Sequence, residues 1–191
     1  MDFHAADALI GDIQSRTLQV GPILVALDGR CAAGKTTLAG ALAARYGWSV
    51  VHLDDFFPRP EQRTPERLAE PGGNLDRERL LAEALDPLQA GREARYRPFD
   101  CRAGRLSEDF RVVPPAQVTL VEGAYACHPA LWDRYALRVF LDVDKAEQRR
   151  RILARDGPAR LEVFLRRWIP LEEAYLAAYD IPRRCDHRIR L

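Results

Sequence analysis

The segment over residues 23–37 decides the fold, and it reads Ile23-Leu24-Val25-Ala26-Leu27-Asp28-Gly29-Arg30-Cys31-Ala32-Ala33-Gly34-Lys35-Thr36-Thr37. Its first five residues are apolar without interruption, which is typical of a parallel strand buried on both faces. Gly29 to Thr36 match the pattern G-x-x-x-x-G-K-T, and a helix is predicted from about Lys35 to Tyr46, with Gly47 at its C-cap. This order of strand, loop and helix predicts a phosphate-binding loop in an α/β protein.

The residue types of this loop suit the phosphates of a nucleotide. Gly29 and Gly34 allow backbone conformations that turn N–H groups toward phosphate oxygens, and the helix that follows adds its dipole. Lys35 is expected to reach the β- and γ-phosphates, and the Thr36 hydroxyl to bind Mg²⁺. We therefore predict that the loop binds ATP with Mg²⁺. Its predicted cofactor-binding residues are Gly29, Arg30, Cys31, Ala32, Ala33, Gly34, Lys35, Thr36 and Thr37.

The rest of the chain repeats the alternation of strand and helix. Apolar runs at 49–53, 118–121 and 137–141 predict three more buried strands, and residues 186–191 predict a final edge strand. Helical spacing predicts helices over 7–16, 75–88, 145–155 and 161–178. We therefore predict an α/β fold, a P-loop NTPase-type three-layer sandwich with a mostly parallel five-stranded sheet, in one domain over residues 1–191. Residues 58–74 are expected to be irregular or weakly helical, and 93–113 to form a small hairpin.

Composition excludes several classes of protein. The chain of 191 residues has 29 basic against 28 acidic residues and a net charge of +1, so neither a nucleic-acid nor a membrane partner is predicted. No apolar run approaches the roughly 18 residues that span a bilayer, and Met1-Asp2-Phe3-His4 lacks the basic start of a secretion signal. The cysteines form no C-x-x-C pair. We expect a cytoplasmic protein, and a homodimer stays open because nothing in the sequence indicates an oligomeric state.

Carboxylates follow two of the predicted strands. Asp54 and Asp55 come after the strand at 49–53, and Glu122 comes after the strand at 118–121. Ligands of parallel sheets bind beyond the carboxyl ends of the strands, so these side chains are expected to face the phosphate loop. Phosphoryl transfer to a hydroxyl needs one carboxylate to accept the proton and another to position Mg²⁺, and Asp54 and Glu122 fit these roles. The alternatives are a helix cap or turn for the Asp pair and a solvated strand end for Glu122, and a role for Asp55 stays open.

Arginines follow the strand at 137–141. Arg151 and Arg155 are four residues apart and share one helix face. A mobile arginine that neutralises the transferred group helps phosphoryl transfer, so residues 145–160 are predicted to form a lid. The alternative is a solvated face on which Glu147 pairs with Arg151. Which arginine contacts phosphate stays open.

With these residues in hand, the sequence resembles the uridine kinase-like family of P-loop kinases over about residues 22–180. That family includes nicotinamide riboside kinases, phosphoribulokinases and bacterial pantothenate kinases. Besides the loop, the matching stretches are Asp54-Asp55-Phe56-Phe57, Val121-Glu122-Gly123, and Arg150-Arg151-Ile152 with Arg155-Asp156. The resemblance implies that Asp54 is the base, that Glu122 ends the third strand of the sheet, and that the arginines belong to a lid.

A further stretch, Tyr96-Arg97-Pro98-Phe99-Asp100, is similar to the one that puts an Asp on the ribose hydroxyls in uridine kinases. By that match Asp100 binds the substrate, and the alternative is a turn-forming Asp after Pro98. The histidine and arginine that follow in uridine kinases are not clear after Cys101, so the acceptor itself stays open. Trp168 is similar to a tryptophan of nicotinamide riboside kinases, or it belongs to the core.

Two further residues carry no assigned role. His128 lies before a proline in a strand-to-helix loop, where a structural role is the simpler interpretation. Cys31 is interpreted as a residue tolerated at an x position of the loop rather than as a redox control, although the predicted helix N-terminus is a position that can lower the pKa of a thiol.

We therefore predict an ATP-dependent small-molecule kinase that phosphorylates a hydroxyl of a nucleoside or nucleoside-like acceptor, with residues 56–113 as the acceptor-binding insertion. The predicted catalytic residues are Lys35, Asp54, Glu122, Arg151 and Arg155, the acceptor-binding residues are Asp54, Phe57, Tyr96 and Asp100, and the metal-binding residues are Thr36 and Glu122. Two alternatives stay open. One is a kinase for a non-nucleoside alcohol such as a sugar, vitamin precursor or antibiotic. The other is a nucleotide-dependent switch or ATPase, although the chain has no Asn-Lys-x-Asp motif of GTPases.

Overall fold

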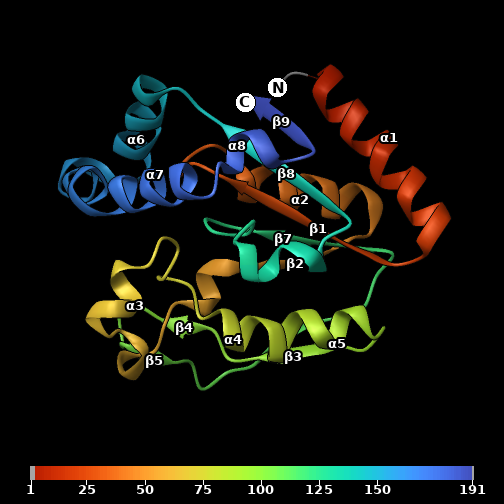
Figure 1. Ribbon diagram of the computed structural model, residues 1–191, viewed down its shortest axis with the longest axis horizontal. Helices are drawn as coiled ribbons and strands as arrows, with labels where there is room; N and C mark the ends of the chain where they lie inside the picture. The colour runs from red at the N-terminus through yellow and green to blue at the C-terminus, as the bar shows by residue number, and fades with distance from the viewer. Residues whose placement is uncertain (1–2, 191) are drawn as a thin grey trace.

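The structure, a computed structural model that describes residues 3–190, is built around a five-stranded sheet (Figure 1). The strand order is β2-β7-β1-β8-β9, and every pair of neighbours is parallel. The strands are β1 (Ile23–Gly29), β2 (Ser49–His52), β7 (Val118–Glu122), β8 (Leu137–Asp142) and β9 (His187–Arg190). The sequence predicted all five, with ends that differ by one or two residues, and the sheet is wholly rather than mostly parallel. Leu191, the end of the predicted last strand, lies outside the described residues.

The helix predicted at 35–46 has the expected bounds, whereas those predicted at 7–16 and 145–155 extend further. The helices are α1 (Phe3–Val20), α2 (Lys35–Tyr46), α3 (Pro65–Ala69), α4 (Arg77–Leu80), α5 (Asp86–Gln89), α6 (Lys145–Val163), α7 (Ile169–Ala178) and α8 (Ile181–Arg184). Short 3₁₀ turns lie at η1 (Leu53–Phe56), η2 (Pro60–Gln62) and η4 (Pro129–Arg134), and π-helical segments lie at η3 (Leu81–Leu85) and η5 (Phe164–Trp168). Gly47 adopts the left-handed C-cap conformation that the sequence predicted for the end of α2. No helix within residues 3–190 is both long and apolar enough to cross a membrane.

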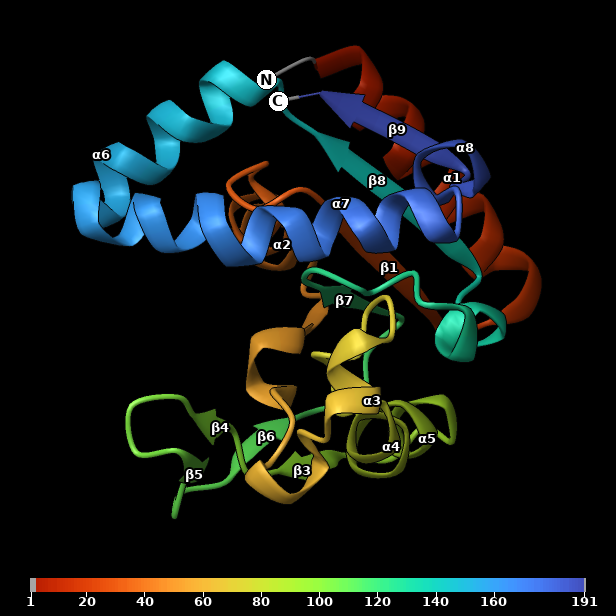
Figure 2. The same ribbon diagram turned by 60° about the vertical axis from the view of Figure 1, so that its left-hand side comes forward.

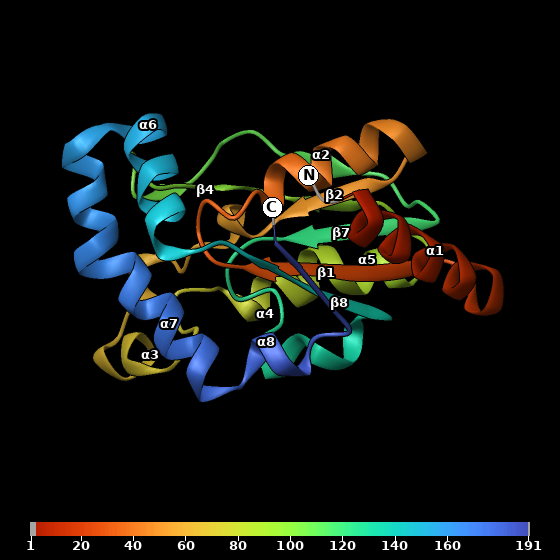
Figure 3. The same ribbon diagram turned by 90° about the horizontal axis from the view of Figure 1, so that it is seen from above.

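Two apolar cores, one on each face of the sheet, hold the layers together. Every residue of β1 is buried, and alternate side chains enter opposite cores, with Leu24 and Ala26 in one and Val25 and Leu27 in the other. The second core is closed by α1 and α2, and the first by α7, α8 and the segment between β2 and β7. Figure 3 shows α2 on one side of β1 and β8, with α7 and α8 on the other. The predicted three-layer sandwich is therefore confirmed.

The segment between β2 and β7 forms a separate group of small elements (Figure 2). The helical stretch from α4 through η3 to α5 packs its apolar side chains into the first core. Two short antiparallel pairs follow it: β3 (Ala94–Tyr96) pairs with β6 (Arg111–Val113), and β4 (Phe99–Asp100) pairs with β5 (Arg105–Leu106). The hairpin expected over 93–113 is thus present. Before it, η2 and α3 supply the weak helicity expected over 58–74.

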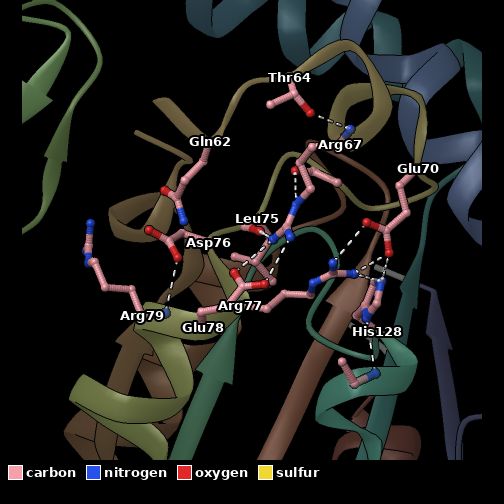
Figure 4. Close-up of polar contacts among 12 residues, drawn as sticks. Gln62, Thr64, Arg67, Glu70, Leu75, Asp76, Arg77, Glu78, Arg79 and His128 are labelled. Carbon is pink, nitrogen blue, oxygen red and sulfur yellow. Dashed lines mark hydrogen bonds and ion pairs between the residues drawn. The ribbon is translucent and has the colours of Figure 1, made fainter. Parts of the chain in front are cut away.

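Arginines tie this segment to itself and to the sheet (Figure 4). The Arg67 guanidinium donates hydrogen bonds to the carbonyl of Leu75 at 2.7 Å and to the carboxylate of Glu78 at 2.9 Å. Arg77 forms an ion pair with Glu70 at 2.7 Å, and one of its terminal nitrogens lies 2.6 Å from Nε2 of His128. Because His128 follows β7, the guanidinium of Arg77 links the segment to the central sheet.

His128 makes the stability of this junction depend on pH. Burial, reinforced by the neighbouring Arg77 charge, lowers the pKa of His128 from 6.5 to about 4. Between these values the unfolded chain binds a proton at His128 and the folded protein does not, so the free energy of unfolding falls as the pH falls from 6.5 to 4. We expect this residue to account for a loss of about 3 kcal/mol over that range.

Urea unfolding of the wild type and of His128→Gln between pH 4 and 7.5 measures this contribution. The variant should lose less stability on acidification than the wild type, whatever its stability at pH 7. Equal losses in the two proteins would contradict the assignment.

Candidate active site

The phosphate loop runs between β1 and α2 at the carboxyl edge of the sheet. Gly29, Ala32 and Gly34 have φ angles of 142°, 59° and 96°, in the left-handed region that favours glycine. A Cβ on Gly29 would lie 2.0 Å from the carbonyl oxygen of Leu141 in β8, so a side chain does not fit there. Both glycines of the motif are thus required by geometry, as the sequence predicted.

The loop is held from outside by charged side chains. Arg30 forms ion pairs with Asp142 at the end of β8, at 2.5 Å, and with Glu173 of α7, at 2.7 Å. Its guanidinium is therefore engaged by the protein, and its contribution to the loop is structural rather than a contact into the cavity. The side chain of Arg151 donates to the carbonyl of Ala32 at 3.2 Å. These contacts join the loop to the helices that follow β8.

Cys31 is also held by side chains of the helices that follow β8, and the pKa of its thiol is raised rather than lowered. Its backbone N–H donates to the carboxylate of Glu172 at 2.9 Å, and its carbonyl accepts from Gln148 at 3.1 Å. Burial raises the pKa of the Cys31 thiol well above its usual range, and the Glu172 charge adds to the effect. The lowering of the pKa that a helix N-terminus can cause is therefore not found here, because desolvation and a nearby carboxylate outweigh the helix dipole.

Lys35 and Thr36 point to the inside of the loop. The ammonium nitrogen of Lys35 lies 2.6 Å from the carbonyl oxygen of Gly29 and 3.0 Å from that of Arg30. The hydroxyl of Thr36 lies 3.1 Å from a carboxylate oxygen of Glu122. The structure thus brings together the loop lysine, the loop hydroxyl and the predicted metal-binding carboxylate.

The residues near Thr36 fit a magnesium ion that also binds phosphate oxygens. Mg²⁺ prefers oxygen ligands and is usually held by one or two protein groups together with the phosphates of a nucleotide. Thr36 and Glu122 offer such oxygens, and Glu122 is buried. Within residues 3–190 no group of three or more His, Cys, Asp and Glu side chains could hold a metal by itself. This donor set therefore fits a nucleotide-bound Mg²⁺ and gives no sign of a metal held by the protein alone.

The two neighbouring aspartates after β2 have different surroundings because the chain turns through η1. Asp55 accepts hydrogen bonds from the Tyr96 hydroxyl at 3.1 Å and from Arg111 at 2.7 Å, outside the cavity. Asp54 lines the cavity with no hydrogen-bond partner among the described residues. The side chain of Asp54 is exposed to solvent at the cavity surface. The protein atoms around the cavity still desolvate its carboxylate, which raises the pKa of Asp54, and the nearby Glu122 charge raises it further.

His52 is a site residue that the sequence analysis missed. It stands opposite Glu122 in the β2–β7 register, and its Nδ1 lies 2.6 Å from a Glu122 carboxylate oxygen. The hydrogen bond to Glu122 raises the pKa of His52. Aligning the two predicted strands in parallel register would have predicted the pairing of His52 with Glu122, since both residues stand at strand ends.

A cavity of about 980 Å³ opens between the loop, the helical stretch from α6 through η5 to α7, and the segment after β2. Lys35, Thr36, Asp54 and Glu122 line one end of it. The predicted acceptor residue Phe57 lines the other, where its ring packs against Phe99 at 5.8 Å and edge-on against Trp168 at 6.0 Å between centroids. Further lining residues include Arg63, Arg151, Arg155, Arg160, Arg167 and Glu172.

The arginines of the predicted lid, Arg151 and Arg155, line this cavity from α6. Arg151 forms an ion pair with Glu147 at 2.7 Å, the local pairing that the sequence left open as the alternative, and it lines the cavity as well. Arg155 pairs with Asp156 at 2.8 Å. Helical geometry is interrupted beyond them at Gly157, where φ is 80°. Both predicted lid arginines are therefore near the phosphate loop.

Two predicted acceptor residues do not line the cavity. The Asp100 carboxylate is exposed and accepts the N–H groups of Arg102 at 2.7 Å and Ala103 at 3.1 Å within its own turn. This is the turn-forming role left open as the alternative. Tyr96 is buried in the first core, and its hydroxyl binds Asp55.

Comparisons with known proteins show the family and the fold of the chain. The chain is 32% identical over 145 residues to a uridine kinase from Chloroflexus aurantiacus, which covers 71% of this chain and 68% of that protein. A structure described as a possible uridine kinase from Bacillus stearothermophilus superimposes with a TM-score of 0.66 at 21% identity, covering 95% of this chain and 99% of that one. D-glycerate 3-kinase from Cryptococcus neoformans has a TM-score of 0.63 at 18% identity, covering 88% and 87%. These two structures show the fold alone. No family model matches the chain.

The contact between Thr36 and Glu122 generates a prediction about metal binding. Glu122→Gln keeps the shape of the side chain and removes its charge, so Mg²⁺ should bind the protein saturated with ADP about tenfold or more weakly. Calorimetric titration of Mg²⁺ into the ADP-bound protein measures the loss. Glu108→Gln, an exposed carboxylate of the hairpin, is the control and should bind as the wild type does. Equal affinity in the Glu122 variant would remove this residue from the metal site.

Proposed function

This chain belongs to the uridine kinase-like family of P-loop kinases, and we propose that it transfers the γ-phosphoryl group of ATP to a hydroxyl of a nucleoside or nucleoside-like acceptor. The relatives named uridine kinase show a phosphotransferase with an alcohol group as acceptor. The finer choice of acceptor is the proposal. We also propose that the enzyme works in the cytoplasm, where ATP is supplied and where its four free cysteines stay reduced.

The observation that carries the proposal is that Asp54 and Lys35 line the same cavity. In the proposed reaction the acceptor oxygen attacks the γ-phosphorus, and its proton passes to the Asp54 carboxylate. The bond from the γ-phosphorus to the bridging oxygen breaks, and ADP leaves with the electron pair. A raised pKa brings Asp54 closer to the working pH, which favours its action as a general base.

Other residues supply charge and position. The loop N–H groups and Lys35 would bind the β- and γ-phosphates, and Arg151 and Arg155 would neutralise charge on them from the lid. Thr36 and Glu122 would hold Mg²⁺, which neutralises phosphate charge when it is bound. The hydrogen bond from His52 would orient the Glu122 carboxylate.

The end of the cavity that Phe57 lines, which we call the acceptor end, is suited to a planar group. Phe57, Phe99 and Trp168 offer aromatic surface against which a ring could stack. The exposed position of Asp100 favours the second candidate, a kinase for a non-nucleoside alcohol, because the carboxylate expected on ribose hydroxyls caps its own turn instead.

Replacing Asp54 tests the proposed base. Asp54→Asn keeps the size of the side chain and removes its ability to accept a proton, so kcat should fall by about 10²-fold or more. The affinity for ATP should stay near the wild-type value, since Asp54 lies outside the phosphate loop. Steady-state kinetics and calorimetry measure the two quantities, and Asp133→Asn, an exposed carboxylate in η4, is the matched control. Near-normal turnover in the Asp54 variant would refute its role.

A screen of acceptors tests the function itself. ADP release is followed with nucleosides, nicotinamide riboside, pantothenate, simple sugars and hydroxy acids, each against a sample without acceptor. We expect ADP release to require an acceptor and to yield a phosphate monoester that mass spectrometry identifies. Full-rate ATP hydrolysis without any acceptor would favour an ATPase instead.

A further inference from the structure

Three arginines line the acceptor end of the cavity, and they come from two sides of it. Arg63 follows η2 in the segment after β2, whereas Arg160 belongs to α6 and Arg167 to η5 on the lid side. Burial raises the pKa of the Cys101 thiol, the charges of Arg63 and Arg160 lower it, and those of Asp54 and Asp100 raise it. The two sides of the cavity therefore bring positive charge to the same region.

Most other arginines of the described chain form ion pairs with carboxylates, and these three do not. Within residues 3–190, Arg63, Arg160 and Arg167 form no ion pair with a carboxylate. By contrast, the lid arginines nearer the loop pair with Glu147 and Asp156. Like charges gathered in a concave site without ion-pair partners repel one another and attract anions.

The acidic residues that line the cavity form no ion pair with these arginines among the described residues. Glu122 is held by Thr36 and His52, and Glu172 by the N–H of Cys31, both beside the phosphate loop. Asp54 is the remaining carboxylate of the lining, and its proposed task is to receive the hydroxyl proton. Asp54 and Asp100 also act on the Cys101 thiol, but among the described residues neither forms an ion pair with these three arginines.

Two of the arginines are held in place by aromatic rings. The guanidinium carbon of Arg63 lies 4.7 Å from the centroid of Phe57 and 4.9 Å from that of Phe99. Its Nε donates to the carbonyl of Pro58, which leaves both terminal nitrogens without a hydrogen-bond partner in the described chain. Arg167 lies 4.6 Å from the Trp168 ring. Stacked guanidinium groups that keep free N–H donors are suited to carboxylate or phosphate.

We propose that the acceptor carries an anionic group, a carboxylate or a phosphate, beside a planar ring, and that Arg63 and Arg167 bind this group while the ring packs against Phe57 and Trp168. The inference rests on the proposed kinase function and specifies its acceptor class. The anionic group is distant from the reacting hydroxyl and is unchanged by the transfer, so the product carries it together with the new phosphate ester. Arg160 adds charge from the lid side.

A binding experiment, which needs no turnover, tests whether the acceptor belongs to this anionic class. The protein is saturated with Mg²⁺ and a non-hydrolysable ATP analogue, so that the whole triphosphate site is filled, and is titrated with phenyl phosphate, benzoate and the neutral benzyl alcohol. We expect at least one of the two anions to bind about tenfold or more tightly than the alcohol. The two anions distinguish a phosphate from a carboxylate acceptor. Equal binding of all three probes, or no binding of either anion, overturns the proposal.

Variants locate the binding site. Arg63→Gln and Arg167→Gln should each weaken the preferred anion about tenfold, and Arg63→Lys should restore part of the affinity because it keeps the charge. Arg166→Gln is the matched control: it stands next to Arg167, pairs with Glu162 and does not line the cavity. Thermal unfolding of each variant confirms that it is folded. Unchanged affinity in both the Arg63 and Arg167 variants, or an equal loss in the Arg166 variant, overturns the assignment.

Turnover separates this inference from the function on which it rests. We compare acceptor pairs that differ by one anionic group, such as uridine and its 6-carboxyl derivative. The anionic member of each pair should have the higher kcat/KM. Arg63→Gln should raise the KM for that acceptor while the KM for ATP stays unchanged. Efficient transfer to neutral acceptors alone would overturn the anionic class and leave the kinase in place. ATP hydrolysis that ignores every acceptor would overturn the kinase, while the binding titration would still report on the arginines.

Discussion

The carbonyl oxygen of Leu141 occupies the place where a side chain on Gly29 would stand, and the site depends on this contact. It sets Gly29 directly against the end of β8, in the register that pairs Gly29 with Leu141. The parallel register on the other side of β1 pairs Leu27 with Glu122, and the next pairs Glu122 with His52. The loop, the candidate metal ligand and the turn that bears Asp54 therefore start from three adjacent strand ends. A shift of one residue in any pair would send these side chains to the opposite face.

Buried carboxylates then hold the loop to the helices around it. Asp28 accepts hydrogen bonds from the N–H of Gly29 and Cys127 and from the hydroxyl of Tyr175, which joins the end of β1 to α7. Asp142 binds Arg30, and Glu172 binds the N–H of Cys31. Removing one partner of such a buried pair costs more than the pair itself contributes, because the other charge is left without compensation. The same contacts link the position of α7, which follows the lid, to the shape of the phosphate loop.

The two ends of the cavity consequently differ in character. At the phosphate end, almost every charged group has a protein partner that fixes its position, as electrostatic preorganisation requires. At the acceptor end, guanidinium groups rest on aromatic rings and their N–H donors are free of carboxylates among the described residues. Under the proposed function, such a site would hold ATP by the geometry of the phosphate loop and would select its acceptor by charge and by stacking.

The sequence by itself determined the strand, the glycine loop and the helix, and with them the α/β class, because apolar runs and glycine positions are local properties. It also placed Asp54 and Glu122 at the loop, since parallel strands end at one edge of the sheet. Tertiary structure alone decided which aspartate enters the cavity, because the η1 turn sends Asp55 to Tyr96 and Arg111. It likewise paired His52 with Glu122, turned Asp100 to its own backbone and raised the pKa of Cys31. Such pairings depend on register, turn geometry and burial among residues far apart in the chain, and no local pattern encodes them.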